Sequence, residues 1–538
     1  MSPNIFYTGT KIAKTGKDIP VLFNGRTFFS EYNPERDIQF YANVPVVKES
    51  GFILVAGLGD GSHIHVLLNE NPTAFLLVLE YNKKTLEYLF ESRICSPDLR
   101  NNPRISFTTP ETLCTDLKNT YIPVLYGTFL YHPVKAWQLA YEQIESKTSG
   151  GGNSLKDMIQ ETLHDIAADY ATQARFGKLM HTNILKNLKL LSENAGTCVS
   201  EAEICTFVAQ NDCKEAAVIG AGPSLDESMS VLRQNRNRFY IISTDTAYRT
   251  LYRNGINADM VVTLDGQNTS ISHFMGIDSS ETIVAADICA NAAAARNLME
   301  KGHKLYFFIT GHPLGTLVNS WYKSDCAPSV TPGANGAPSD APLLPLYTAG
   351  CGTVLSAAAD IAVKAGFRSI RFFGADFAYK SGKPYTRGTY LDDTFLSGCN
   401  RVVPEETSFC ALCYRTELTK TDSGYTTPLL ASYKNYLISY IETHNASFSF
   451  VKSGSNLPES KAKSFEKQVS QLSVQKKSHL PFDYEKFISF FIDGLKNNDK
   501  SLLFSILPYA TWIKEKEKNA DIKDIFAKAV EITALRRS

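Results

Sequence analysis

Residues 216–225 read AAVIGAGPSL, and this stretch decides the fold that we expect. Small and β-branched residues up to Ile219 favour a buried strand, which runs directly into a turn containing Gly220 and Gly222. Pro223 suits the first turn of the helical stretch that follows, where Ser224 can cap the helix or bind a phosphate. A strand, a glycine turn and a helix present free backbone N–H groups and the positive end of the helix to an anion. The stretch predicts a phosphate-binding turn, and a tight turn without a ligand is the alternative.

From residue 216 onward, short apolar runs alternate with helical stretches. The runs RFYIISTD, ADMVVTLD, ETIVAAD, KLYFFIT and SIRFFGAD have the length and the residues of strands. This alternation predicts an α/β fold in which helices cover both faces of a doubly wound, mostly parallel sheet. In such sheets the ligand crevice lies at the carboxyl ends of the strands, although a carboxylate there can also cap the next helix. The polar strand-end residues are Thr244, Asp245, Thr246, Asp265, Gln267, Asn268, Asp287 and Asp376.

A second glycine-rich turn reads TAGCGT at residues 348–353 and contains Gly350, Gly352 and Thr353. A helix of small residues follows it, and we expect this turn to form another wall of the crevice. The stretch from Cys326 to Tyr347, which precedes the turn, carries five prolines and is too long for an ordinary connection. It is either a lid over the crevice or a surface insert.

The N-terminal region carries its own strand, glycine turn, helix and strand, GFILVAGLGDGSHIHVLLNENPTAFLLVLE, at residues 51–80. Glu80 ends the second strand, as does the acidic residue that binds ribose hydroxyls in Rossmann-type sites. The unit therefore predicts a Rossmann-like domain. Its glycine turn binds a nucleotide or S-adenosylmethionine, or it is an empty unit of the same shape.

The length of 538 residues favours about three domains, and composition shifts divide the chain into four segments. Residues 1–150 form the Rossmann-like domain, 151–205 a helical connector that begins with a glycine-rich joint, 206–455 the central domain, and 456–538 a helical module.

Composition excludes several classes of protein. The 55 basic residues balance the 55 acidic ones, so we expect neither a nucleic-acid nor a membrane partner. The first twenty residues lack the apolar core of a signal peptide, and no apolar run is long enough to span a bilayer. Eleven scattered cysteines fit a reducing compartment, and Cys410 and Cys413 lack the further ligands that zinc needs. We expect a cytoplasmic protein with no metal site among these residues.

The order of three stretches resembles the Maf (motility associated factor) flagellin glycosyltransferase family. They are VIGAGPSL, the TLD strand end, and GCGTVLSAAADIAVKAGFRSIRFFGADFAYKSGK. The glycine-rich unit at residues 51–80 also resembles the N-terminal domain of that family, so the resemblance covers roughly residues 50–455. It implies an enzyme that transfers a nonulosonic, sialic-acid-like sugar from a CMP donor to serine or threonine hydroxyls of flagellin, in support of flagellar assembly and motility.

The core is also similar to bacterial CMP-sialate sialyltransferases, which implies a central domain of GT-A-like, sialyltransferase-like architecture. Those enzymes have a GxGPSL turn that holds CMP and a GxDF strand end followed by two tyrosines six residues apart. Here the strand end reads GADF at 374–377, and Tyr379 and Tyr385 have that spacing. The resemblance implies that this pair, with Asp376, is catalytic, because phenol hydroxyls can donate hydrogen bonds to the departing phosphate without a metal ion. The residues expected to bind the donor are Gly220, Gly222, Pro223, Ser224, Thr244, Asp245, Asp265, Gly350, Gly352 and Thr353.

The chain departs from these families at the general base. The region before the last helix, TKTDSGYTTPLLASYKNYL, has no histidine where the sialyltransferases have one, and KPYTR at residues 383–387 has none where many Maf sequences have one. Asp245, Asp265 and Asp376 are the carboxylates that could act as the base, or they could bind a divalent metal. Arg387 either pairs with the donor or is a surface residue. The resemblance implies no tightly bound cofactor, and it leaves the metal requirement and the oligomeric state open.

Three alternatives remain. The central pattern also resembles archaeal pterin diphosphokinases, which use ATP and magnesium, although the chain has no GxxxxGK[ST] loop. The chain could instead be a non-catalytic protein that binds flagellin through its helical module. A third alternative is methyl transfer by the N-terminal unit.

Overall fold

The computed structural model describes residues 4–148, 154–210, 215–278, 280–326, 342–350, 352–422, 424–444, 446–451 and 482–537. The chain forms two compact units, residues 1–175 with 510–518, and residues 176–509 with 519–538. The four-segment division expected from the sequence stays a prediction. The glycine-rich joint at 149–153, most of the proline-rich stretch and the beginning of the expected C-terminal module lie outside the described residues.

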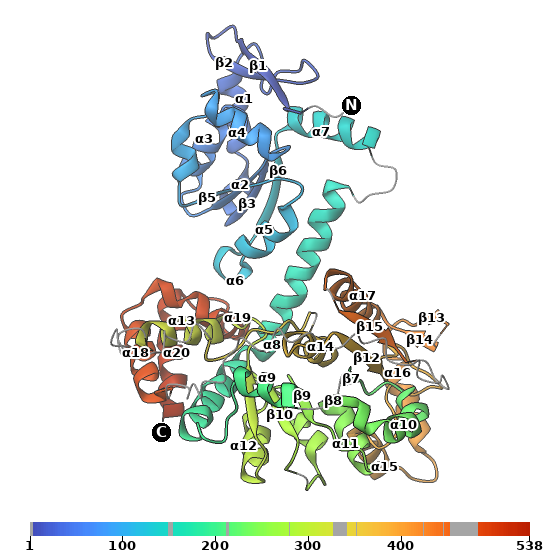
Figure 1. Cartoon of the computed structure of the whole chain (residues 1–538). Helices are drawn as coiled ribbons and strands as arrows, with labels where there is room; N and C mark the ends of the chain where they lie inside the picture. Colours follow the sequence, from blue (N-terminus) through green and yellow to red (C-terminus); the bar gives the residue numbers. More distant parts are fainter. Residues whose placement is uncertain are drawn as a thin grey trace. The chain divides into compact units, whose positions relative to one another are not determined.

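The first unit is built on a parallel sheet with the strand order β5-β4-β3-β6, and a separate hairpin pairs β1 with β2 (Figure 1). β3 is buried along its whole length, as a central parallel strand covered on both faces must be. The elements are β1 (Tyr7–Ile12), β2 (Asp18–Leu22), α1 (Pro34–Ala42), α2 (Pro45–Glu49), β3 (Phe52–Ala56), α3 (Ser62–Glu70), β4 (Phe75–Leu79), α4 (Lys83–Glu91), η1 (Pro97–Asn101), β5 (Ile105–Thr108), α5 (Leu113–Thr120), α6 (Pro123–Tyr126), β6 (Phe129–Pro133) and α7 (Lys135–Thr148).

Helix α8 (Leu155–Glu193) begins in the first unit and ends in the second. Its second half is fixed to the second unit by two buried asparagines. Asn183 donates to the carbonyls of Gly266 and Cys289 over 3.0 and 3.1 Å, and Asn187 donates to those of Ile288 and Ala290 over 2.9 Å each. These bonds hold the connections that follow β9 and β10 in place.

The second unit alternates strands and helices as the sequence predicts. Its elements are α9 (Glu201–Gln210), β7 (Glu215–Ile219), α10 (Leu225–Gln234), η2 (Arg236–Arg238), β8 (Phe239–Thr244), α11 (Asp245–Arg253), β9 (Met260–Thr263), η3 (Asn268–Phe274), β10 (Ile283–Asp287), α12 (Ala292–Glu300), β11 (Leu305–Phe308), α13 (Pro313–Cys326), α14 (Val354–Lys364), β12 (Ser369–Phe373), α15 (Tyr390–Ser397), α16 (Glu405–Cys413), β13 (Thr419–Thr421), β14 (Gly424–Thr426), α17 (Pro428–Thr443), β15 (Ser447–Phe450), α18 (Tyr484–Lys496), η6 (Lys500–Leu502), η7 (Phe504–Ile506), α19 (Leu507–Lys516, whose end belongs to the first unit) and α20 (Ile522–Arg537).

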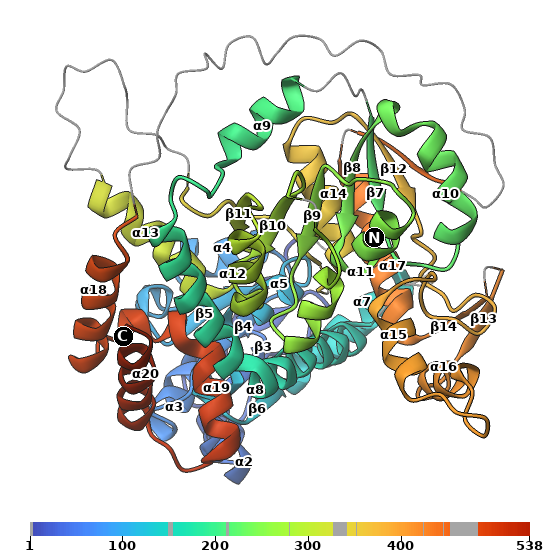
Figure 2. The same ribbon diagram turned by 90° about the horizontal axis from the view of Figure 1, so that it is seen from below.

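The large sheet of this unit has the order β11-β10-β9-β8-β7-β12-β15, and every neighbouring pair is parallel. Helices α9 and α12 lie on opposite sides of it (Figure 1 and Figure 2). This confirms the predicted doubly wound α/β arrangement. The strand order reverses between β7 and β12, and such a switch point is where open α/β sheets bind their ligands.

One face of this sheet packs against α9, α14 and α17, with Val218, Ile242 and Val262 in the core. Alanines 357, 358 and 359 of α14 are fully buried, and their small side chains let this helix lie close to the strands. At the C-terminus, Trp321 of α13 packs its ring edge-on against Phe487 of α18, with centroids 5.3 Å apart. Helices α18, α19 and α20 confirm the helical C-terminus expected from the sequence.

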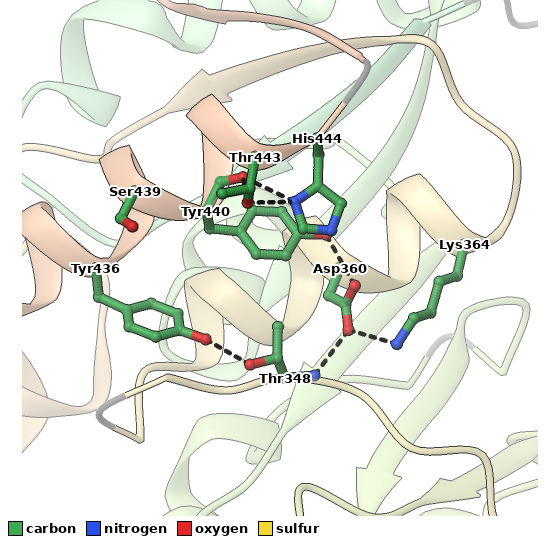
Figure 3. A pocket seen from close by; sticks show the side chains of 8 residues that line it. All are labelled: Thr348, Asp360, Lys364, Tyr436, Ser439, Tyr440, Thr443 and His444. Carbon is green, nitrogen blue, oxygen red and sulfur yellow. Dashed lines mark hydrogen bonds and ion pairs between the residues drawn. The ribbon is translucent and has the colours of Figure 1, made fainter. Parts of the chain in front are cut away.

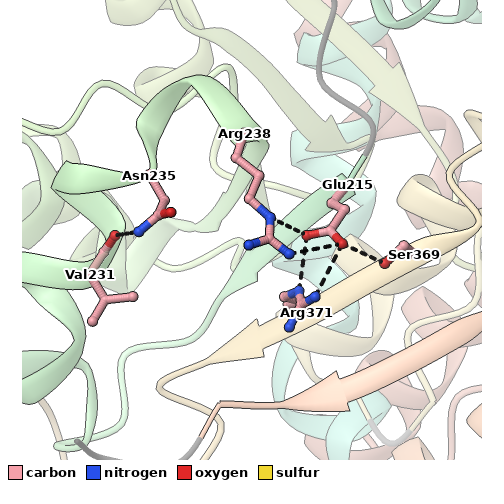
Figure 4. Close-up of polar contacts among 6 residues, drawn as sticks. All are labelled: Glu215, Val231, Asn235, Arg238, Ser369 and Arg371. Carbon is pink, nitrogen blue, oxygen red and sulfur yellow. Dashed lines mark hydrogen bonds and ion pairs between the residues drawn. The ribbon is translucent and has the colours of Figure 1, made fainter. Parts of the chain in front are cut away.

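The amino ends of β7 and β12 are joined by a buried ion cluster (Figure 4). Glu215, the first residue of β7, accepts hydrogen bonds from Nε and Nη2 of Arg371 on β12 over 3.0 and 3.1 Å. Arg238 donates to the same carboxylate over 2.9 Å. Because Glu215 and Arg371 are 1% and 6% exposed, the cluster fixes the two strands that flank the switch point.

Candidate active site

The glycine turn after β7 packs directly against the loop after β12. The N–H of Gly220 donates to the carbonyl of Phe373, and that of Gly222 to the carbonyl of Gly374, each over 2.8 Å. A Cβ at Gly222 would lie 2.2 Å from Asp376 Oδ2, and one at Gly220 would lie 2.6 Å from the carbonyl oxygen of Gly374. These two glycines are therefore required by the neighbouring loop, whatever ligand the turn binds.

The start of α10 already holds an anion, the carboxylate of Asp376. Its Oδ2 accepts a hydrogen bond from the backbone N–H of Ser224 over 2.8 Å. Ser224 is buried and directly precedes α10, after Pro223. Because a negative charge is favourable at a helix N-terminus, Asp376 stabilises the turn. A phosphate at this place would compete with that carboxylate, whereas the hydroxyl groups nearby could donate to a phosphate without displacing it.

The loop that carries both tyrosines is strained and firmly held. Phe377 and Ser381 adopt left-handed backbone conformations with φ of 49° and 53°, which cost energy in residues other than glycine. The N–H of Thr386 donates to the carbonyl of Ala221 over 2.8 Å, and that of Arg387 donates to Asp226 Oδ1 over 3.2 Å. The loop after β12 and the glycine turn therefore form one structural body, and strain of this kind clusters at functional sites.

Tyr379 and Tyr385 keep their hydroxyl protons at neutral pH. Burial raises the pKa of Tyr385, and the neighbouring Tyr390, Asp245 and Tyr379 raise it further. Burial also raises the pKa of Tyr379, whose backbone pairs with Tyr425 over 2.6 and 3.1 Å. The structure thus brings the two tyrosines and Asp245 together, with two phenol hydroxyls able to donate hydrogen bonds to an anion.

The strand-end residues of β8 and β9 are occupied by protein contacts. Asp245 is 2% exposed and accepts hydrogen bonds from Thr263 Oγ1 and the N–H of Thr246 over 2.8 and 2.7 Å. Thr244 donates its hydroxyl to the carbonyl of Ile219 over 3.1 Å. Asp265 accepts from the N–H of Gln267 over 2.8 Å. These side chains order the carboxyl edge of the sheet.

Asp287 has a similar role at the end of β10. Its carboxylate accepts from Thr310 Oγ1 and from the N–H of Cys289 over 2.8 and 2.6 Å. Burial raises its pKa. Asp287 therefore ties the end of β10 to the end of β11.

The second glycine-rich turn lies against α17 and next to the first. Gly350 has a left-handed φ of 57°, and a Cβ there would lie 2.3 Å from the ring of Tyr436. Thr353 directly precedes α14, whose Leu355 side chain would lie 3.3 Å from a Cβ at Gly220. The first turn of α14 is therefore beside the glycine turn after β7, so two helix N-termini meet there. Gly352 has a φ of 87° with open space around it, and Cys351 lies outside the described residues.

Two residues of this edge were missed by sequence reasoning, Tyr390 and His273. Burial raises the pKa of Tyr390, and Asp265 and Asp245 raise it further. The ring of His273 meets that of Tyr390 edge-on, with centroids 4.7 Å apart. No motif marks either residue, because the two lie far apart in the chain and only the fold brings them to the same strand ends.

A separate pocket of about 400 Å³ lies between α14 and α17 (Figure 3). At its floor the carboxylate of Asp360 accepts from the N–H of Thr348 over 2.7 Å, from Lys364 Nζ over 2.9 Å and from Tyr440 OH over 2.8 Å. His444 stacks on Tyr440, with ring centroids 3.9 Å apart. The polar groups at the floor thus bind one another.

No group of three or more metal-binding side chains occurs in the described ranges of the chain. Cys410 is exposed and Cys413 is buried, and both thiols are free. Over those same ranges no helix has the length and the apolar character to cross a bilayer.

The glycine turn of the first unit is filled by aromatic side chains. Glu80 is fully buried and accepts hydrogen bonds from Trp137 Nε1, the N–H of Leu58 and Tyr7 OH over 2.7, 2.9 and 3.0 Å. The N–H of Gly59 donates to the same tyrosine hydroxyl over 3.2 Å. Burial raises the pKa of Glu80. The carboxylate that would bind a ribose in a nucleotide site thus joins the N-terminal hairpin to the sheet, which favours the empty Rossmann-like unit.

The fold is similar to that of a Maf glycosyltransferase. The solved structure of the MAf glycosyltransferase from Magnetospirillum magneticum AMB-1 matches 100% of this chain and 86% of its own, with a TM-score of 0.51 and 13% sequence identity. Similarity at this level of identity concerns the fold. The expected resemblance to this architecture is confirmed.

Sequence comparison adds nearer relatives. A protein of Treponema pallidum (strain Nichols), named only as uncharacterized, is 30% identical over 253 residues, which are 46% of this chain and 74% of that protein. The chain belongs to the same family as this treponemal protein. A second uncharacterized protein of that organism is 27% identical over 180 residues, or 32% of this chain and 77% of its own. Residues 189–382 also match the family described as 6-hydroxymethylpterin diphosphokinase MptE-like.

Proposed function

We propose that the second unit is a glycosyltransferase that moves a nonulosonic, sialic-acid-like sugar from a CMP donor to serine or threonine hydroxyls of flagellin in the cytoplasm. The observation that carries the proposal is the position of Tyr379 and Tyr385. They lie on a strained loop that is bonded to the glycine turn at the switch point between β7 and β12. The similarity of the fold to a Maf glycosyltransferase supports it.

The chemistry of the proposal needs a stabilised leaving group. When the bond between the anomeric carbon and the CMP phosphate oxygen breaks, negative charge develops on that phosphate. Tyr379 and Tyr385 are protonated donors in a partly buried place, where a hydrogen bond to a charged group is stronger than in water. In this proposal the phosphate binds to the two hydroxyls, since Asp376 already occupies the start of α10.

The remaining site residues would shape the donor pocket. The glycine turn with Pro223 and Ser224 would line one wall, and Gly350, Gly352 and Thr353 would line another beside α14. Thr244, Asp245 and Asp265 would order the strand ends that face ribose, base or acceptor. Arg387 is exposed, and we propose that it pairs with the carboxylate or phosphate of the donor.

A transfer assay tests the proposal. The double variant Tyr379→Phe, Tyr385→Phe should lose about 100-fold or more of the transfer rate, the usual loss for one oxyanion donor. CMP should stabilise this variant against heat nearly as well as it does the wild type. Tyr414→Phe is a matched control, because Tyr414 is 70% exposed and lies outside the site. Wild-type turnover in the double variant would refute the role of the tyrosines.

The match of residues 189–382 to the MptE-like family supports a second candidate, a Mg-ATP-dependent pterin diphosphokinase. Thermal stabilisation by CMP, ATP, UDP, GDP and S-adenosylmethionine, each with and without magnesium, separates the candidates. Stabilisation by CMP without magnesium favours sugar transfer, and stabilisation by ATP only with magnesium favours the kinase. Flagellin capture without any nucleotide response would instead favour a non-catalytic flagellin-binding protein.

A further inference from the structure

His273 is a buried histidine at the carboxyl edge of the large sheet. It lies in η3, the connection from β9 to β10, and is 6% exposed. Its Nδ1 is enclosed without a hydrogen-bond partner among the described residues. Buried polar atoms are normally hydrogen-bonded, and an exception needs an explanation such as a catalytic role.

The surroundings of His273 connect it with the proposed catalytic residues. Its ring contacts Tyr390 edge-on at 4.7 Å between centroids. Asp265 and Asp245 lie near enough to Tyr390 to raise its pKa, and Tyr390 in turn raises that of Tyr385. Asp245, Asp265, Tyr385 and Tyr390 are therefore among the titratable groups of this region.

The carboxylates of the same edge are less suited to accept a proton from a substrate. Asp245 accepts three hydrogen bonds, from the N–H and hydroxyl of Thr246 and the hydroxyl of Thr263, and is 2% exposed. Asp376 accepts from the backbone of Ser224, and Asp265 accepts from that of Gln267. Nδ1 of His273 has no hydrogen-bond partner in the described part of the chain, so it can take up a proton without first breaking a bond that orders the turn.

We propose that His273 is the general base of the transfer reaction, an inference that rests on the proposed function. The neutral imidazole accepts the proton of the acceptor hydroxyl while that oxygen forms its bond to the anomeric carbon. The bond from this carbon to the CMP phosphate oxygen breaks, and CMP leaves with the electron pair, held by Tyr379 and Tyr385. Water then takes the proton from the imidazolium.

The arrangement of residues suits a displacement at one carbon. In such a reaction the base acts on the side of the sugar opposite to the leaving group. His273 comes from the connection after β9, whereas Tyr379 and Tyr385 come from the loop after β12. Tyr390 contacts the ring of His273 and raises the pKa of Tyr385. The proposed base and the two leaving-group donors thus come from different connections at the carboxyl edge of the sheet.

Chemical rescue tests the proposal on the full chain. His273→Ala should lose about 100-fold or more of the transfer rate, the usual contribution of a general base, while CMP still stabilises the protein. Added imidazole should restore some of the lost rate in this variant and leave the wild type unchanged. His164→Gln is the matched control, since His164 is an exposed histidine on α8.

A second variant keeps the test decisive if the alanine variant does not fold. His273→Gln keeps the size of the side chain but has no basic nitrogen. This variant should lose about as much of the transfer rate as the alanine variant. Wild-type turnover in either variant would overturn the role of His273 alone. A wild-type protein that binds CMP but transfers no sugar would instead overturn the proposed function, and the base with it.

Discussion

The backbone N–H of Ser224 donates to Asp376 Oδ2 over 2.8 Å, which ties the turn after β7 to the loop after β12. Two sequence motifs more than a hundred residues apart therefore form one contact at the switch point of the sheet. The contact explains why a carboxylate follows the strand β12. It gives Asp376 a structural role that does not depend on catalysis.

We expect Asp376→Ala to lower the free energy of unfolding by about 1–3 kcal/mol, because it leaves the N–H of Ser224 without its acceptor. Asp376→Asn keeps an oxygen acceptor and should lose less stability. Urea titration of both variants measures the difference. If Asp376 acts only on structure, the asparagine variant keeps most of its sugar transfer. A folded asparagine variant without transfer would instead establish Asp376 as a catalytic residue.

The second prediction concerns the glycine turn itself. Gly222→Ala places a Cβ at 2.2 Å from Asp376 Oδ2 and 2.6 Å from the carbonyl oxygen of Gly374. We expect it to lower the free energy of unfolding by about 1–3 kcal/mol in the absence of nucleotide, as overpacking does.

Thermal melts without and with CMP separate packing from binding in this variant. At Gly352 a Cβ would meet nothing within 4 Å, so Gly352→Ala measures the cost of the backbone conformation alone. A Gly222→Ala protein that melts like the wild type without nucleotide would show that the two loops do not pack as described.

The ion cluster at the amino edge supports a third prediction. Glu215→Ala removes the carboxylate that both Arg238 and Arg371 contact, and with it the buried ion pairs that join β7 to β12. We expect a loss of about 3–5 kcal/mol in the free energy of unfolding. Below the melting temperature the affinity for CMP should be unchanged, because the cluster lies at the opposite ends of the strands. Arg253→Ala, which removes a partly exposed ion pair with Asp393, is the control and should cost little.

The sequence predicts the sheet well because its signals are local. Each strand is a short apolar run, and the glycine turn after Ile219 and the carboxylates after β8, β9 and β12 lie at the strand ends as expected. The reason for Gly220 and Gly222 could not be predicted, since the atoms that exclude a Cβ belong to the loop after β12.

The candidate site could be predicted only partially, for the same physical reason. Tyr379 and Tyr385 follow a motif, whereas His273 and Tyr390 are brought together by the fold and carry no local pattern. Glu80 shows the reverse case. Its position after a strand matches a nucleotide site, but Tyr7 and Trp137, distant in sequence, bind its carboxylate. A pattern along the chain cannot show which side chains fill a crevice.

The last prediction concerns the pH dependence of stability. His181 on α8 is 1% exposed and stacks on Tyr509 with ring centroids 5.0 Å apart. Neither of its nitrogens has a hydrogen-bond partner within the described ranges of the chain. Burial, with a smaller effect of the nearby His312, lowers the pKa of His181 from 6.5 to about 3. The folded state therefore disfavours the proton that the unfolded chain binds below pH 6.5. This contribution to stability is fully present above that pH and is lost as the pH falls toward 3.

At pH 5 this loss amounts to about 2 kcal/mol for His181 alone. His181→Phe keeps an aromatic ring on Tyr509 and removes the titrating group, so its free energy of unfolding should fall less between pH 7 and pH 5 than that of the wild type. Urea titrations at the two pH values measure the difference, and His164→Gln on the exposed side of α8 should leave it unchanged. His312, whose pKa burial lowers to about 4, adds to the slope in all three proteins. Equal slopes in the wild type and His181→Phe would mean that water reaches this ring in solution.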